Sequence, residues 1–193
     1  MAGILAVLYT SLAALPVPFQ PVHLLFINLL TDSLPALAIG MEPAERDVLS
    51  EKPRNPKGGI LERRFMALLL GQGALIAVCT MISFEVGLKE SAALASTMAF
   101  ATLTLARLFH GFNCRSRHSI VKIGFRRNWY SLGAFALGVL LLALVLFVPA
   151  LETLFLVEKM NGMQLGCVGV MAVLPTFVIQ SFKVVGEVSG REK

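Results

Sequence analysis

The chain has 193 residues, of which 56% are hydrophobic and only 15% are charged, and its mean hydropathy is +0.75. Soluble domains are far more polar, so the composition excludes a soluble globular fold and indicates one polytopic membrane domain. The net charge of +5 does not indicate a nucleic-acid-binding protein, because the basic residues flank apolar runs, as they do in the cytosolic loops of membrane proteins.

Six apolar runs predict an all-α membrane protein, folded as a six-helix transmembrane bundle. A span needs about 20 residues, and the first run, over residues 2–15, is shorter than that, so we expect a truncated first helix. The second run, over residues 20–40, contains Pro35, and we expect a discontinuous helix there. The remaining spans are expected at about residues 65–86, 91–112, 129–148 and 162–182.

Lysine and arginine are concentrated on alternate connections. Six lie in the loop 41–64, which is rich in proline and glycine and is expected to lack regular structure, five lie in the loop 113–128, and three lie in the tail from Lys183. The connections on the other side contain only Lys89 and Lys159. The positive-inside rule therefore places both loops and the C-terminus in the cytosol, and six spans place the N-terminus there as well.

The apolar run 22–39 has a single formal charge, on Asp32. A carboxylate at membrane depth is costly unless something compensates it. Thr31 and Asp32 lie three and four residues after Asn28, so on a helix all three share one face. Pro35 leaves the carbonyl of Thr31 without its helical partner. These oxygens predict a cage for a hard cation, and the alternative is a hydrogen-bonded contact between helices.

Arg107 lies within the fourth span. One interpretation is that its side chain snorkels to the cytosolic face. The other is a fixed positive charge beside the cage, which pairs with Asp32 or another carboxylate when the cation leaves. A guanidinium stays protonated and cannot ligate a cation, so this second interpretation lowers the number of cations that the site holds. His23 opens the second span and is expected at the membrane interface.

The stretch Pro21–Ala36 closely resembles the sixth transmembrane helix of P-type cation pumps of the calcium-ATPase group. Met41–Pro43 and Lys52–Lys57 are similar to the family's loop between its sixth and seventh helices, and Arg107–Asn113 is similar to its eighth-helix signature. The resemblance covers essentially the whole chain. It implies that the six spans are helices five to ten of a calcium-transporting P-type (type II) ATPase of the bacterial type.

By this resemblance, Asn28, Thr31 and Asp32 correspond to calcium-coordinating residues, and calcium is the transported ion. Pumps that carry two calcium ions have a glutamate in the eighth helix where this chain has Arg107. The resemblance therefore implies one calcium per cycle, with Arg107 as a counter-charge in the membrane. The family's fifth-helix glutamate aligns with Gly3 and its asparagine precedes the first residue, so we expect the cation site in this chain to be incomplete.

The family hydrolyses ATP with an Asp-Lys-Thr-Gly-Thr motif and large cytosolic domains, which this sequence does not contain. We therefore expect a transport portion that cannot hydrolyse ATP alone, with ATP and magnesium used only in the full-length pump. The expected location is a bacterial plasma membrane, and the expected partners are the lipid bilayer, calcium and the cytosolic and N-terminal transmembrane parts of the pump.

Two alternatives remain from the sequence. In the first, the chain is a non-enzymatic membrane subunit or an inactive fragment. In the second, it is part of a sister pump for manganese, sodium or protons. Oxygen ligands alone do not separate calcium from manganese.

Overall fold

The structure is a computed structural model that describes residues 1–43, 63–116, 118–124 and 128–189, without the side chains of Leu30, Thr31 and Arg64. Every regular element in these stretches is a helix. Five helical segments are long and apolar enough to cross a membrane. The expected all-α membrane bundle is therefore confirmed.

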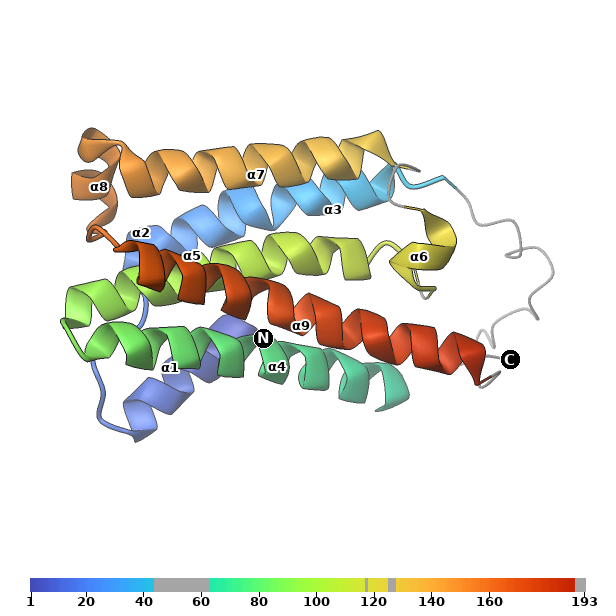
Figure 1. The fold of residues 1–193 in the computed structure, drawn as a ribbon, viewed down its shortest axis with the longest axis horizontal. Coiled ribbons are helices and arrows are strands. Elements are labelled where there is room, and N and C mark those ends of the chain that lie inside the picture. Colours follow the sequence, from blue (N-terminus) through green and yellow to red (C-terminus); the bar gives the residue numbers. More distant parts are fainter. Residues whose placement is uncertain (44–62, 117, 125–127, 190–193) are drawn as a thin grey trace.

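Figure 1 shows the helices in chain order. α1 (Ala2–Leu12) has 11 residues and is shorter than a membrane span. The second span consists of three consecutive pieces, α2 (Pro21–Phe26), η1 (Ile27–Thr31) and α3 (Ser33–Gly40). The remaining helices are α4 (Arg63–Leu88), α5 (Ala92–Asn113), α6 (Ile120–Ile123), α7 (Trp129–Phe147), α8 (Pro149–Phe155) and α9 (Gly162–Val188).

α3, α5 and α9 end, and α4 and α7 begin, on one side of the bundle, which we call the basic end (right in Figure 1). The sequence predicts that the last span ends near Phe182, but α9 continues to Val188. The predicted loop 113–128 contains the short helix α6. Most of the predicted irregular loop 41–64 falls on residues 44–62, outside the described part of the chain.

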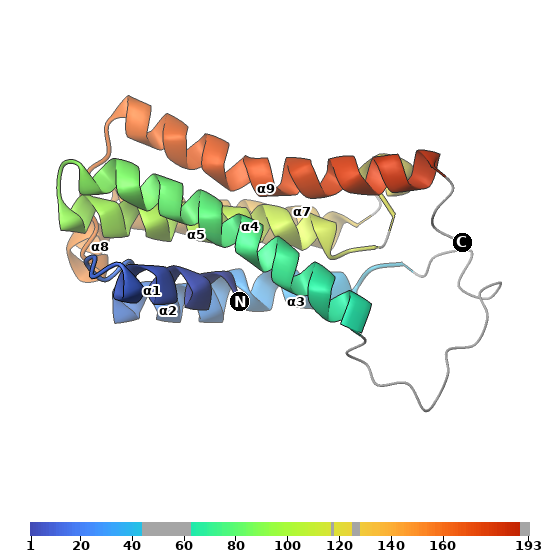
Figure 2. The same cartoon turned by 90° about the horizontal axis from the view of Figure 1, so that it is seen from below.

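α5 is the central helix of the bundle (Figures 1 and 2). It packs against α3, α4, α7 and α9, and 72% of its span is buried, compared with 22–33% for the other four candidate spans. Its buried residues include Ala95, Ala99 and Thr102, whose small side chains let neighbouring helices approach closely. Polar residues of α5 therefore lie where side chains from several helices can reach them.

The turn between α4 and α5 is tight because both helices contribute small residues. A Cβ atom on Gly87 would lie 2.7 Å from the Cα atom of Ala95, so this approach requires glycine. Ser91 caps α5, since its hydroxyl accepts a hydrogen bond from the backbone N–H of Leu94 at 2.9 Å. These local features make α4 and α5 an antiparallel hairpin.

α9 holds the end of α5 and the segment that follows it through a row of polar side chains. Asn113 donates a hydrogen bond to Thr176 at 3.2 Å and accepts one from Gln180 at 2.6 Å. Further along α9, Glu187 accepts hydrogen bonds from the backbone N–H and the hydroxyl of Ser119, each at 2.7 Å. These hydrogen bonds stabilise the part of α9 that extends beyond the apolar run.

His23, which the sequence predicts at the level of the membrane interface, is fully buried among the helices. Its ring stacks on Phe100 with the centroids 4.3 Å apart. Nδ1 accepts a hydrogen bond from the backbone N–H of Gln20 at 3.2 Å, so Nε2 carries the proton and donates to the carbonyl oxygen of Phe155 at 2.8 Å. One neutral tautomer therefore satisfies both nitrogens and ties α2 to α8.

Candidate cation site and the broken helix

The helix that carries the predicted site is interrupted by a π-helical turn, η1. The backbone N–H of Asp32 donates to the carbonyl oxygen of Ile27, five residues earlier, at 3.1 Å. α3 resumes at Ser33 and contains Pro35. Pro35 has no N–H and its ring crowds the carbonyl four residues before it, which disfavours a regular α-helical turn just before α3. π-helical turns are frequent at functional sites.

The predicted ligands lie on or beside this turn. Asn28 belongs to η1, and its side chain is exposed. Thr31 ends η1, and its side chain lies outside the described part of the structure. Asp32 follows directly and joins η1 to α3. Because one π-helical turn spans about five residues, Asn28 and Asp32 are within one turn of each other.

Arg107 of α5 forms an ion pair with Asp32, with Nη2 3.0 Å from Oδ2. The side chains of Arg107 and Asp32 are 27% and 42% exposed in this chain. The guanidinium thus points to the carboxylate of the broken helix. Of the two interpretations of Arg107, this contact is the one expected of a positive charge beside Asp32.

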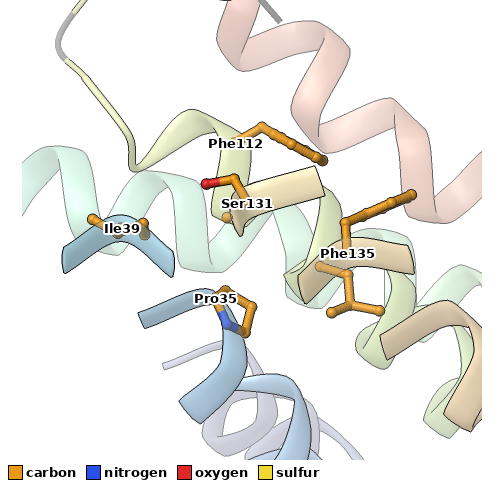
Figure 3. Close-up of a pocket in the computed structure, with 7 residues that line it drawn as sticks. Pro35, Ile39, Phe112, Ser131 and Phe135 are labelled. Carbon is orange, nitrogen blue, oxygen red and sulfur yellow. The ribbon is translucent and has the colours of Figure 1, made fainter. Parts of the chain in front are cut away.

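Between the ion pair and the basic end, α3 and α5 are in close contact. A Cβ atom on Gly111 would lie 3.3 Å from the Cβ atom of Pro35, so glycine is what lets the proline approach. Figure 3 shows a pocket beside this contact, lined by Pro35, Ile39, Leu108, Gly111, Phe112, Ser131 and Phe135. Its lining is mostly apolar, and the buried hydroxyl of Ser131 has no hydrogen-bond partner among the described residues.

A second arginine–carboxylate pair lies at the basic end. Arg115 contacts both carboxylate oxygens of Glu42, with Nε–Oε2 at 2.8 Å and Nη2–Oε1 at 3.0 Å. Asn128 donates to Oε2 of Glu42 and to the carbonyl oxygen of Ala38, each at 2.8 Å. The Arg115 and Glu42 side chains are only 2% and 12% exposed. We call Glu42, Arg115 and Asn128 the clamp.

Sequence reasoning did not find the clamp. In the sequence, Glu42 belongs to a loop motif and Arg115 indicates only topology. Their contact joins residues 73 positions apart. Asn128 alone carried a local signal, because it precedes the apolar run of α7 as an N-cap residue does. In the structure its Oδ1 accepts from the backbone N–H of Ser131 at 3.1 Å, so Asn128 is the N-cap of α7.

Among the described residues, no group of three or more His, Cys, Asp or Glu side chains could hold a metal ion. Calcium takes about six to eight oxygen ligands. A calcium ion bound at Asp32 therefore needs amide, hydroxyl, backbone carbonyl or water oxygens in addition to this carboxylate. The exposed Asn28 and the irregular backbone of η1 are compatible with such a mixed set.

The sequence matches the family described as "Cation transporting ATPase, C-terminus" over residues 16–185. It is 38% identical to the calcium-transporting ATPase of Bacillus subtilis, over 91% of this chain and 20% of that protein. It is 36% identical to calcium-transporting ATPase 1 of Lactococcus lactis, over 97% of this chain and 22% of that protein. It is 31% identical to the rat calcium-transporting ATPase type 2C member 2, over 86% of this chain and 18% of that protein.

Proposed function

The chain belongs to the family of C-terminal segments of cation-transporting ATPases, and from this premise we propose that it moves calcium across a membrane as the transport portion of a P-type pump. It spans about a fifth of the length of the curated relatives it matches. ATP hydrolysis, with magnesium and the cytosolic domains, is therefore a property that we assign to the complete pump. The N-terminal transmembrane part is the proposed membrane partner.

The observation that carries this proposal is the ion pair between Asp32 and Arg107 beside the π-helical turn. In the complete pump, Asn28, Thr31 and Asp32 contribute oxygen ligands to one calcium ion. Oxygen ligands of mixed type suit calcium, which tolerates irregular coordination. Helices that are interrupted at membrane depth recur in transporters, because their free backbone groups help to hold the ion.

Arg107 acts as a tethered counter-charge in this mechanism. When calcium binds to Asp32, the guanidinium moves off the carboxylate, because two positive charges repel strongly in a medium of low dielectric constant. When calcium leaves, Arg107 returns, and Asp32 is not left as an unpaired anion in the membrane. The exchange limits the site to one calcium per cycle and removes the need for a proton on Asp32.

The distribution of lysine and arginine supports an orientation for the pump. Both long loops and the C-terminus lie in the cytosol, and the similarity to bacterial pumps favours the plasma membrane of a bacterium. Calcium then reaches Asp32 from the side of the basic end and leaves toward the side of α8. The loop that begins at Met41 takes part in coupling the site to the cytosolic domains.

The test uses the complete pump in membranes and measures phosphorylation from ATP as a function of calcium concentration. Asp32→Asn removes the carboxylate charge and is expected to abolish calcium-dependent phosphorylation. Glu152→Gln is the matched control, because Glu152 lies in α8 at the opposite end of the bundle, and it is expected to behave as the unmodified pump. Unchanged phosphorylation in Asp32→Asn would contradict the proposed site.

Two further outcomes separate the alternatives. Titration is expected to give one calcium per phosphoenzyme, and a value of two would refute the role of Arg107. Phosphorylation that responds to manganese, sodium or protons but not to calcium would identify a sister pump. A complete gene product with no ion-dependent phosphorylation would identify a non-enzymatic subunit.

A further inference from the structure

We propose that the clamp residues Glu42, Arg115 and Asn128 are positioning residues for the cation site. The clamp holds α3 at one height along α5, and this height sets how Asp32 meets Arg107. The inference rests on the proposed function for its consequence in transport. Its geometric part concerns the described chain alone and is tested separately below.

Three contacts join the broken helix and the residues just after it to α5 and the segment that follows α5, in the same order along both. From membrane depth to the basic end they are Asp32–Arg107, Pro35–Gly111 and Glu42–Arg115. α3 and α5 both run toward the basic end (Figure 1), so the three contacts follow one another along two parallel helices. A slide of α3 along α5 therefore changes all three contacts together.

Of the three contacts, Glu42–Arg115, nearest the basic end, opposes such a slide most strongly. The paired hydrogen bonds of Arg115 to Glu42 fix direction as well as distance. Asn128 adds a third element, because it bonds the carboxylate of Glu42 and the carbonyl oxygen of Ala38 in the last turn of α3. A movement of α3 therefore breaks bonds to the segment after α5 and to the start of α7.

Both sides of the clamp are attached stiffly to the helices they hold. The backbone N–H of Glu42 donates to the carbonyl oxygen of Ile39 at 3.0 Å, so the turn of α3 continues to the carboxylate. The backbone N–H of Cys114 donates to the carbonyl oxygens of His110 and Gly111, each at 3.2 Å, so Arg115 directly follows the last turn of α5. The clamp therefore fixes the positions of α3 and α5 directly, because no flexible segment separates it from either helix.

A cysteine cross-link between α3 and α5 measures this height. Pro35→Cys and Gly111→Cys are combined in the complete pump after Cys79, Cys114 and Cys167 are replaced by alanine. A Cβ atom at Gly111 would lie 3.3 Å from the Cβ atom of Pro35, which is close to the Cβ–Cβ distance of a disulfide. The rate of oxidative cross-linking in this parent is the reference for all clamp variants.

Arg115→Met and Asn128→Ala are each expected to slow the cross-link several-fold, because α3 is no longer held at one height. The milder Arg115→Lys keeps the charge but loses the paired geometry, and it provides a folded variant if Arg115→Met does not accumulate. Glu187→Gln is the matched control, because it loosens the same segment from α9 rather than from α3, and its rate is expected to be unchanged. An unchanged rate in Asn128→Ala and Arg115→Lys overturns the proposal.

The functional consequence is measured with Pro35, Gly111 and the cysteines restored. In Asn128→Ala and Arg115→Lys, the calcium concentration for half-maximal phosphorylation is expected to rise several-fold, while the maximal phosphoenzyme per folded pump is retained. A purely structural role lowers the amount of folded pump and leaves half-saturation unchanged, and that result overturns the positioning role. If the unmodified pump shows no calcium-dependent phosphorylation, the proposed function fails, and the cross-link still decides the clamp.

Discussion

The ion pair Asp32–Arg107 and the ion pair Glu42–Arg115 connect the same two parts of the bundle at different depths. In the first, Nη2 of Arg107 lies 3.0 Å from Oδ2 of Asp32, and the side chains are 27% (Arg107) and 42% (Asp32) exposed. The second has two contacts, of 2.8 and 3.0 Å, and its side chains are 2% (Arg115) and 12% (Glu42) exposed. Asn128 belongs only to the second pair.

The same two functional groups therefore form a contact that can open and a contact that stays closed. The Asp32–Arg107 pair has the more exposed side chains of the two pairs, so a competing cation reaches it more readily. Removing one partner of a buried, hydrogen-bonded pair costs about 3–5 kcal/mol. A site that exchanges a guanidinium for calcium needs the first kind of contact, and the frame that holds the site needs the second.

The largest expected effect comes from breaking the buried pair. Arg115→Met removes the guanidinium that neutralises Glu42 and is expected to lower the free energy of unfolding of the complete pump by about 3–5 kcal/mol. Unfolding in detergent, followed by circular dichroism with increasing denaturant, measures the change. The double variant Glu42→Gln with Arg115→Met is expected to recover part of the loss, because the buried charge is gone as well. A single variant as stable as the parent contradicts the assignment of a fixed contact.

The next effect comes from separating α3 and α5 at the contact of Pro35 with Gly111, which lies between the two ion pairs. Gly111→Val places a branched side chain against Pro35, where a Cβ atom alone would lie at 3.3 Å, and is expected to cost about 1–3 kcal/mol through overpacking. Gly133→Val on α7 is the control, because a Cβ atom there meets nothing within 4 Å. Equal unfolding free energies for the two variants would show that α3 and α5 are not in close contact.

A smaller effect on stability is expected from the accessible pair. Arg107→Gln is expected to lower the free energy of unfolding by less than Arg115→Met does, because the carboxylate that it leaves unpaired is more exposed than that of Glu42. It is also expected to lower the calcium concentration for half-maximal phosphorylation, because calcium no longer competes with a guanidinium for Asp32. If Arg107→Gln destabilises the pump as much as Arg115→Met does, the contrast between the two pairs is wrong.

The smallest expected effect is a difference between the two ion pairs in how their coupling energies depend on salt concentration. Double-mutant cycles give the coupling energy of each pair, with Asp32→Asn and Arg107→Gln for the first, and Glu42→Gln and Arg115→Met for the second. Raising the salt concentration is expected to weaken the first coupling more than the second, because the side chains of the first pair are more exposed. Equal salt dependence would indicate equal access of ions to both pairs.

Local chemistry made the main features of the candidate site predictable. Asp32 stands out because a charge in an apolar run is costly, and Pro35 predicts an irregular helix because it lacks an N–H. The π-helical form of the interruption was not predictable, since it depends on which carbonyl the N–H of Asp32 reaches. For Arg107 the sequence left two interpretations, and only the packing of α5 against the broken helix distinguishes between their geometries.

The sequence by itself determined that the chain forms apolar helices of membrane length, because a lipid bilayer leaves backbone groups no partners except those within a helix. It also determined, through the distribution of lysine and arginine, which connections share a side of the bundle. The tertiary structure alone decided that Arg115 and Asn128 meet Glu42, and that His23 reaches the carbonyl oxygen of Phe155, 132 residues away. Such contacts depend on how closely helices pack around α5, and residue periodicity along one helix contains no information about its neighbours.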